Sequence, residues 1–202
     1  MAPRRYDPDA TRQAILETAH RIFVERGVAE TPISQVAAAA GVTKSLIHHH
    51  FGSKEELWFE IKRVAFEPFF DGILEIIRSD VSHIDALTNV VRHMFGYFHE
   101  RPDMARMMAW KRMEKDNVCM DLENKVTTEG IARIAQAQAE GVIRKDLEPA
   151  NIQMSFIILT TGWFQNKHMF ENWPGVDPDQ LSERYLEDVL TLFYGGVLAK
   201  NP

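Results

Sequence analysis

Residues 31–57, TPISQVAAAAGVTKSLIHHHFGSKEEL, constrain the fold more than any other part of the chain. Apolar residues recur at helical spacing before Gly41. Gly41 then supplies a turn, because glycine enters the left-handed backbone region without a steric penalty. Thr43 can cap a second helix by accepting a backbone N–H. The stretch therefore predicts two short helices joined by a tight turn, followed by the start of a third helix.

The second of these predicted helices has one apolar face and one polar face. At about 100° per residue, Ile47 and Phe51 share one side of it. Ser45, His48 and His49 lie on the opposite side. A helix of this width fits the major groove of DNA when one face packs on its neighbours and the other offers hydrogen-bond donors. The pattern is typical of a helix-turn-helix.

Residues 11–57 resemble the N-terminal domain of the TetR family of bacterial transcriptional regulators. The matching segments are TRQAILETAHRIFVERG, TPISQVAAAAGV, TKSLIHHHF and GSKEEL. The resemblance implies a homodimer that binds a double-stranded DNA operator, and a helical C-terminal domain. His48 stands where the family usually has a tyrosine that touches a phosphate. Histidine can also donate to phosphate, but it adds a charge that depends on pH.

We expect the exposed side of the second helix to contact DNA. Phosphate contacts position a protein without reading sequence, whereas contacts to base edges read it. A lysine can bind guanine, and a leucine can pack on a thymine methyl group. The residues expected to contact phosphates are Thr43, His48 and Lys54. The residues expected to read bases are Lys44, Ser45, Leu46 and His49.

The rest of the chain repeats apolar residues at steps of three and four, with no strand-like alternation. Ser53 and Glu56 form a capping box that opens a long helix. Helices are expected over residues 10–26, 54–78, 83–100, 104–115, 121–141, 150–170 and 181–199. The predicted fold is all-α, with a three-helix helix-turn-helix domain at 1–53 and a larger helical ligand-binding and dimerisation domain at 54–202.

The second predicted domain is rich in aromatic and sulfur-containing residues. Such residues fit an ordinary core, and they also fit a ligand site, because these sites are mostly apolar and methionine adapts to irregular shapes. Both interpretations stay open. The residues expected to bind a small apolar or amphipathic effector are His93, Phe95, Met107, Trp110, Trp163 and Phe164.

The last two predicted helices are candidates for the homodimer interface, because their apolar stripes are wide and the terminal one is unusually so. The resemblance implies the same arrangement. The residues expected at this interface are Phe156, Leu159, Leu186, Val189, Leu190 and Phe193.

The net charge of −6 does not by itself favour a nucleic-acid partner. The first 60 residues are nevertheless near neutral, with seven Lys and Arg against eight Asp and Glu, and the charge at the contact surface matters more than the total. The single cysteine, Cys119, suits a reducing cytoplasm. No apolar run is long enough for a membrane span, and residues 1–12 lack the apolar stretch of a signal peptide, so a cytoplasmic location is expected.

No nucleophile–base pair, phosphate-binding glycine loop or metal-ligand pattern is recognisable, so no enzyme activity, cofactor or metal is expected. Adjacent helical residues diverge by about 100°, so the three histidines at 48–50 cannot converge on one ion. The predicted function is a ligand-responsive transcriptional regulator, a repressor by resemblance. Two alternatives remain: a helical protein-interaction module without DNA binding, and an enzyme acting on a hydrophobic substrate.

Overall fold

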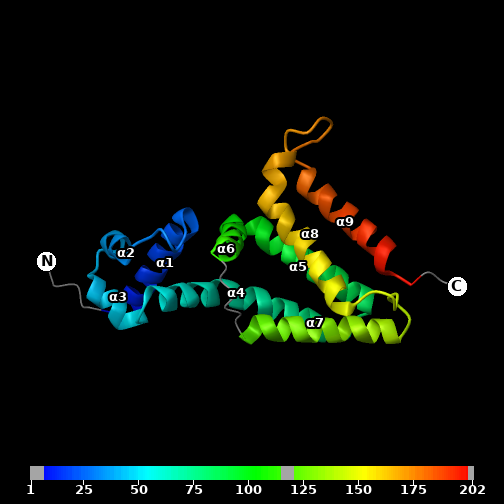
Figure 1. Ribbon diagram of the computed structural model, residues 1–202, viewed down its shortest axis with the longest axis horizontal. Helices are drawn as coiled ribbons and strands as arrows, with labels where there is room; N and C mark the ends of the chain where they lie inside the picture. Colours follow the sequence, from blue (N-terminus) through cyan, green and yellow to red (C-terminus); the bar gives the residue numbers. More distant parts are fainter. Residues whose placement is uncertain (1–6, 115–120, 200–202) are drawn as a thin grey trace. The chain divides into compact units, whose positions relative to one another are not determined.

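The computed structural model describes residues 7–114 and 121–199, and these residues form nine α-helices. Cys119 lies outside the described residues. The helices are α1 (Pro8–Arg26), α2 (Ile33–Ala40), α3 (Lys44–Phe51), α4 (Lys54–Arg78), α5 (His83–Glu100), α6 (Pro102–Met113), α7 (Asp121–Ala139), α8 (Pro149–Phe170) and α9 (Leu181–Val197) (Figure 1). The prediction of an all-α fold is confirmed.

Helix ends follow local capping chemistry. α4 and α5 begin and end at the predicted residues. α1 begins at Pro8, before the predicted residue 10, because the Asp7 carboxylate accepts hydrogen bonds from the N–H groups of Asp9 and Ala10. Pro8 fits the first turn, where its missing N–H costs nothing. The predicted start of α1 was therefore too late.

Packing divides the described chain into two compact units. Unit 1 contains residues 7–66 and 106–114, and unit 2 contains residues 67–105 and 121–199. The predicted domain boundary lies at residue 53, with a long linking helix over about 54–78. In the packing, the first half of α4 and most of α6 lie with the N-terminal helices. α4 and α6 therefore each contribute to both units.

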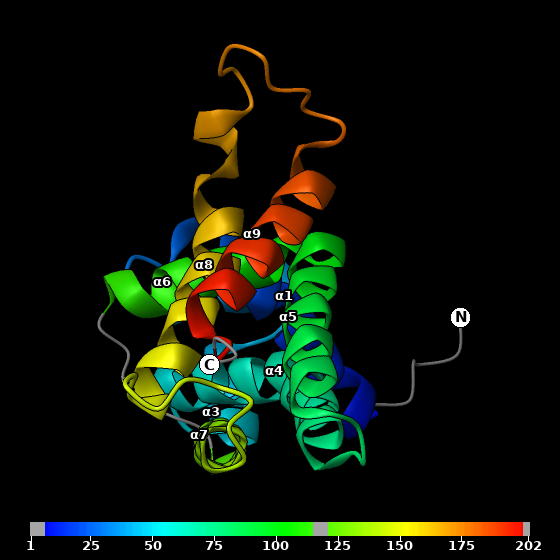
Figure 2. The same ribbon diagram turned by 90° about the vertical axis from the view of Figure 1, so that its right-hand side faces the viewer.

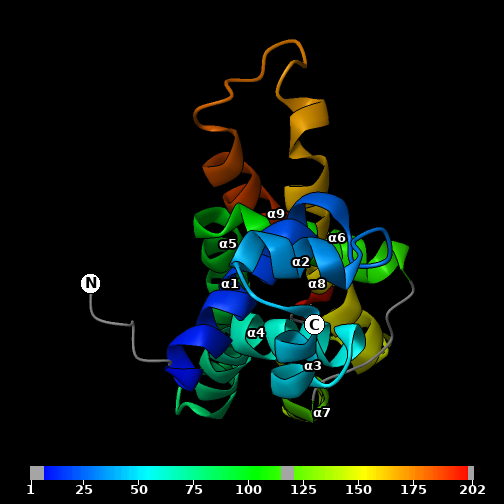
Figure 3. The same cartoon turned by 90° about the vertical axis from the view of Figure 1, so that its left-hand side faces the viewer.

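Unit 1 is built around α1, α2 and α3, which Figure 3 shows in the foreground. Gly41 ends α2 in the left-handed conformation, with φ of 66°, and starts the turn into α3. The hydroxyl of Thr43 then caps α3 by accepting the Leu46 N–H at 3.2 Å. The predicted turn and cap are both confirmed. The most deeply buried side chains of this unit include Ile15, Phe23, Val36, Ile47 and Leu57.

Unit 2 is a helical bundle in which α5 packs against α7, α8 and α9. α8 and α9 lie side by side and are joined by a loop of residues 171–180, which lies beyond the other helices of this unit (Figures 1 and 2). The buried side chains that fill the bundle include Val91, Met94, Phe95, Phe98, Ile152 and Trp163.

Candidate nucleic-acid interface

α3 presents a polar face to solvent. Ile47 and Phe51 are buried, whereas Ser45, His48 and His49 are exposed. The remaining residues predicted to contact DNA from this helix and its cap are Thr43 and Lys44, which are exposed, and Leu46, which is half-buried. The helix therefore keeps its donor-rich side free while its apolar side anchors it in unit 1.

The buried side of α3 is held by Arg12 and by its carboxylate partner, Glu60. The guanidinium of Arg12 lies 5.0 Å from the centre of the Phe51 ring. The same guanidinium donates to Glu60 Oε1 at 2.5 Å, and Arg63 Nε donates to Glu60 Oε2 at 2.8 Å. Hydrogen bonds from Arg63 and then Arg12 lower the pKa of Glu60 from 4.5 to about 2. Glu60 is thus a charged link between α1 and α4.

The link from α3 to α4 is a capping box, as predicted. Ser53 Oγ accepts the Glu56 N–H at 3.0 Å, and Glu56 Oε2 accepts the Ser53 N–H at 2.7 Å. Immediately before it, the Nδ1 atom of His48 lies 2.6 Å from the carbonyl oxygen of Gly52. The His48 ring is therefore tied to the C-terminal end of its own helix.

The ammonium of Lys54 is engaged inside unit 1. It donates to the carbonyl oxygens of Val28, Ala29 and Thr31 at 2.9, 3.3 and 3.4 Å. An ammonium has three N–H donors, so this geometry uses all of them and does not favour the predicted phosphate contact. Lys54 instead holds the turn between α1 and α2. Sequence reasoning missed this role because the acceptors lie 23 to 26 positions away.

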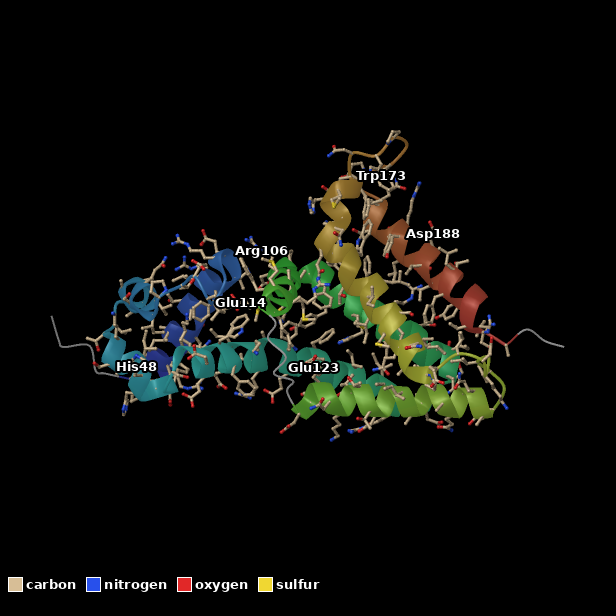
Figure 4. The ribbon with its side chains drawn as sticks, viewed as in Figure 1. His48, Arg106, Glu114, Glu123, Trp173 and Asp188 are labelled. Carbon is tan, nitrogen blue, oxygen red and sulfur yellow. The ribbon has the colours of Figure 1, made fainter. Side chains whose placement is uncertain are left out.

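The same α1–α2 turn is held from α6. Glu114 Oε1 accepts the N–H groups of Val28 and Ala29 at 2.9 and 3.0 Å. One turn earlier, the indole N–H of Trp110 donates to the carbonyl of Val24 at 3.0 Å. Figure 4 shows Glu114 and His48 at opposite ends of unit 1. Glu114 therefore holds the amides of the α1–α2 turn, and Lys54 holds its carbonyls.

Two residues predicted to bind an effector thus belong to unit 1. Trp110 serves the α1–α2 turn, and Met107 is only 1% exposed in the same compact unit. The other four residues belong to unit 2. The predicted set is divided between the two units, because α6 begins in unit 2 and ends in unit 1.

Three of the predicted effector residues do come together in unit 2. Phe95 and Phe164 have ring centres 4.7 Å apart. Trp163 stacks on Tyr185 at 4.1 Å, and its indole N–H donates to Ser182 Oγ at 3.3 Å. Trp163 and Phe95 are buried, and Phe164 is half-buried. These contacts fit both a packed core and the wall of an apolar site.

His93 packs on a neighbouring aromatic group. Its ring stacks on Phe69 at 5.7 Å between centres, and its Nε2 lies 3.1 Å from the Phe69 carbonyl oxygen. Since a carbonyl only accepts, Nε2 carries the proton in this contact. His93 therefore joins α5 to α4 within unit 2.

A cavity of about 820 Å³ lies elsewhere in unit 2, between the α4–α5 turn and α7. None of the predicted effector residues lines it. Arg133 crosses it to donate to the carbonyls of Ile77, Ser79 and Val81. Two ion pairs also line it, Arg78 with Glu129 and His83 with Glu140. Local sequence patterns gave no signal for this cavity, because its walls come from distant segments.

Four of the predicted interface residues are buried inside the subunit: Phe156, Leu186, Val189 and Leu190. Their apolar stripe lies in the core of unit 2. Phe193 is half-buried and Leu159 is 38% exposed. Periodicity identified an apolar face of each helix but not which of two faces turns inward.

Among the described residues, no group of His, Cys, Asp and Glu side chains is arranged to hold a metal ion. In the same part of the chain, no helix has both the length and the apolar character that a membrane span requires.

Comparisons with known proteins match both parts of the chain. Residues 15–61 match the bacterial regulatory proteins of the tetR family, and residues 87–187 match the tetracyclin repressor-like C-terminal domain. The HTH-type transcriptional repressor SCO4008 of Streptomyces coelicolor is 25% identical over 160 residues, which cover 78% of this chain and 79% of the relative.

Solved structures share the fold. The transcriptional regulator SCO4942 of Streptomyces coelicolor has a TM-score of 0.72 at 21% identity, over 94% of this chain and 99% of the other. The complex of AibR with isovaleryl coenzyme A and operator DNA has a TM-score of 0.68 at 21% identity, over 90% and 97%. With both of its domains matched, the chain belongs to the tetR family of bacterial regulatory proteins.

Proposed function

We propose that the protein is a ligand-responsive transcriptional repressor of the cytoplasm, which binds a palindromic operator as a homodimer and is not an enzyme. The observation that carries the proposal is the exposed polar face of α3, with Ser45, His48 and His49 turned to solvent on a helix anchored by Ile47 and Phe51. In a dimer, two such helices enter successive major grooves about 34–36 Å apart.

A gel-shift titration on the DNA that flanks the protein's own gene tests this proposal. Affinity is expected to fall steeply with salt, because each neutralised phosphate releases a counterion. Lys44→Ala is expected to weaken binding, whereas Lys125→Ala is the matched control, an exposed lysine on α7 of unit 2. Equal effects of the two variants, or no specific binding to any flanking fragment, would contradict the proposal.

The proposed dimer surface is the outward face of α8 and α9. Exposed apolar side chains follow one side of α8, with Met154 50% exposed, Ile158 66% and Met169 60%, and Leu192 on α9 is 75% exposed. Large exposed apolar side chains gathered on one face often mark a protein–protein interface. These exposed residues extend the predicted interface on the same two helices, where Leu159 is also exposed.

Analytical ultracentrifugation tests this surface. Ile158→Asp is expected to shift the protein toward monomer, because the new carboxylate loses its water on association. Met113→Asp is the matched control, since Met113 is 68% exposed on α6. A dimer unchanged by Ile158→Asp would place the interface elsewhere.

A small apolar or amphipathic effector is proposed to bind unit 2 beside Phe95, Trp163 and Phe164. Clustered rings with few polar groups suit such a ligand. The related AibR structure contains isovaleryl coenzyme A together with operator DNA.

The amphipathic dye 1-anilinonaphthalene-8-sulfonate serves as a probe for this site. The dye is expected to bind the native protein and to release the operator fragment from it. Phe164→Ala is expected to weaken that release and leave operator affinity unchanged; unaltered release would exclude this site.

The response is proposed to travel through α4 and α6, because both helices contribute residues to the two units. At the end of α6, Glu114 holds the amides of Val28 and Ala29. Glu114→Ala is expected to retain operator binding but to reduce its release by the dye. Equal release from the variant and the wild type would assign the coupling to α4 alone.

A further inference from the structure

The contact between His48 and Gly52 fixes where the imidazole carries its proton. Nδ1 of His48 lies 2.6 Å from the Gly52 carbonyl oxygen. A carbonyl oxygen can only accept a hydrogen bond, so Nδ1 is the donor. In neutral His48 the other ring nitrogen, Nε2, then has a lone pair and no hydrogen. Among the described residues, Nε2 makes no hydrogen bond of its own.

The acceptor in this contact is held in place by the end of the helix. Gly52 has φ of 77°, which L side chains rarely adopt, and its N–H donates to the His48 carbonyl at 2.8 Å. A Cβ at this position would collide with the carboxylate of Glu56, which is itself held by the N–H of Ser53. The direction of the Gly52 carbonyl is therefore set by the capping box, and the His48 ring follows it.

We propose that His48 binds an operator phosphate only as the imidazolium, so that operator binding takes up a proton at this side chain. Phosphate oxygens are acceptors, and the lone pair of a neutral Nε2 would face them with no hydrogen to share. A second proton turns Nε2 into a charged donor while Nδ1 keeps its bond to Gly52. This inference rests on the proposed function, because it requires the exposed face of α3 to meet DNA.

The titratable groups around His48 decide which controls the test needs. α2, which packs on α3, carries no titratable side chain. Other titratable groups lie on α3 itself, at the start of α4, and on side chains that reach α3 from α1 and α4. They are Arg12, Lys44, His49, His50, Lys54, Glu55, Glu56 and Glu60. Lys44 keeps its charge across this range. His49, exposed on the same face, is replaced in the control variant, and His50, which is half-buried, is kept in all three proteins.

The test measures operator affinity at pH 6 and pH 8, at equal ionic strength, for the wild type and two variants. Histidine ordinarily changes charge between these values. The wild-type dissociation constant is expected to rise about tenfold per subunit from pH 6 to pH 8, as one linked proton is lost. His48→Gln supplies a neutral N–H donor and is expected to change by about twofold or less. His49→Gln is expected to keep the wild-type change.

The outcomes separate the proton linkage from the function on which it depends. Specific binding with the same pH change in His48→Gln as in the wild type would overturn the linkage and leave the proposed function standing. No specific binding by any of the three proteins at either pH would overturn the proposed function. Nitrogen-15 NMR of the free protein at pH 8 is expected to show the Nδ1–H tautomer for His48; the Nε2–H tautomer would overturn the inference without reference to DNA.

Discussion

The α1–α2 turn of unit 1 and the aromatic cluster of unit 2 are held in different ways. In unit 1, polar side chains grip backbone groups: Lys54 binds three carbonyls of the α1–α2 turn, and Glu114 binds two of its amides. In unit 2, rings stack on rings, as Trp163 does on Tyr185. Hydrogen bonds are directional and fix the path of a turn, whereas apolar packing tolerates a change of occupant. The difference suits a fixed turn in unit 1 and an adaptable site for the proposed effector in unit 2.

The largest effect expected from this comparison is at Trp163. Trp163→Ala is expected to reduce the free energy of unfolding by about 3–5 kcal/mol, because it removes a buried ring and leaves a cavity. Urea denaturation measures the change. Trp173→Ala is the matched control, since Trp173 is 60% exposed in the α8–α9 loop (Figure 4). A loss below about 1 kcal/mol for Trp163→Ala would mean that its ring lines an open site and does not fill a core.

Lys54 tests the polar grip of unit 1. Lys54→Ala is expected to cost about 2–3 kcal/mol of stability, because it leaves three turn carbonyls without their charged donor. Thermal unfolding measures it, and Lys44→Ala, at an exposed position, is expected to stay within about 0.5 kcal/mol of the wild type. Wild-type stability with strongly reduced operator affinity for Lys54→Ala would restore the predicted phosphate contact.

Lys44 tests whether the exposed face of α3 reads sequence. Lys44→Ala is expected to weaken operator binding by about 1–3 kcal/mol and to relax the preference at one base pair, if the lysine binds guanine. Binding to a set of singly substituted operators measures this. A uniform loss across all operators would instead identify Lys44 as a phosphate contact.

Glu60 gives the smallest expected effect. Glu60→Gln is expected to cost about 1 kcal/mol at neutral pH, since its two arginine partners are partly exposed. The pKa of Glu60 is lowered to about 2 from 4.5. Its contribution is therefore complete above pH 4.5 and is lost as the pH falls toward 2. The melting temperatures of variant and wild type should converge over this range; a constant difference would show that the charge of Glu60 is unimportant.

Features encoded by neighbouring residues were predictable. The turn at Gly41, the cap at Thr43 and the capping box of Ser53 with Glu56 each depend on a few consecutive residues, and the structure has all of them. Periodicity likewise gave both ends of α4 and α5. The exposed and buried sides of α3 follow from the helical repeat alone.

Features that depend on distant partners were not predictable. Nothing near Lys54 indicates that it points back to the α1–α2 turn, and nothing near Trp110 indicates that α6 returns to unit 1. For α8 the helical repeat of apolar residues predicted one apolar side. Ile158, on a different side of the helix, is also apolar, and it is 66% exposed. Only packing decides which side faces inward.

The amino-acid sequence by itself determined the helices, their caps and the family, because each is specified by the order of residues along the chain. The tertiary structure alone decided which charged side chains bind the protein's own backbone, as Lys54 does, and which stay exposed, as Lys44 does. It also placed the proton of His48, because that proton depends on a carbonyl whose direction is set by the start of the next helix.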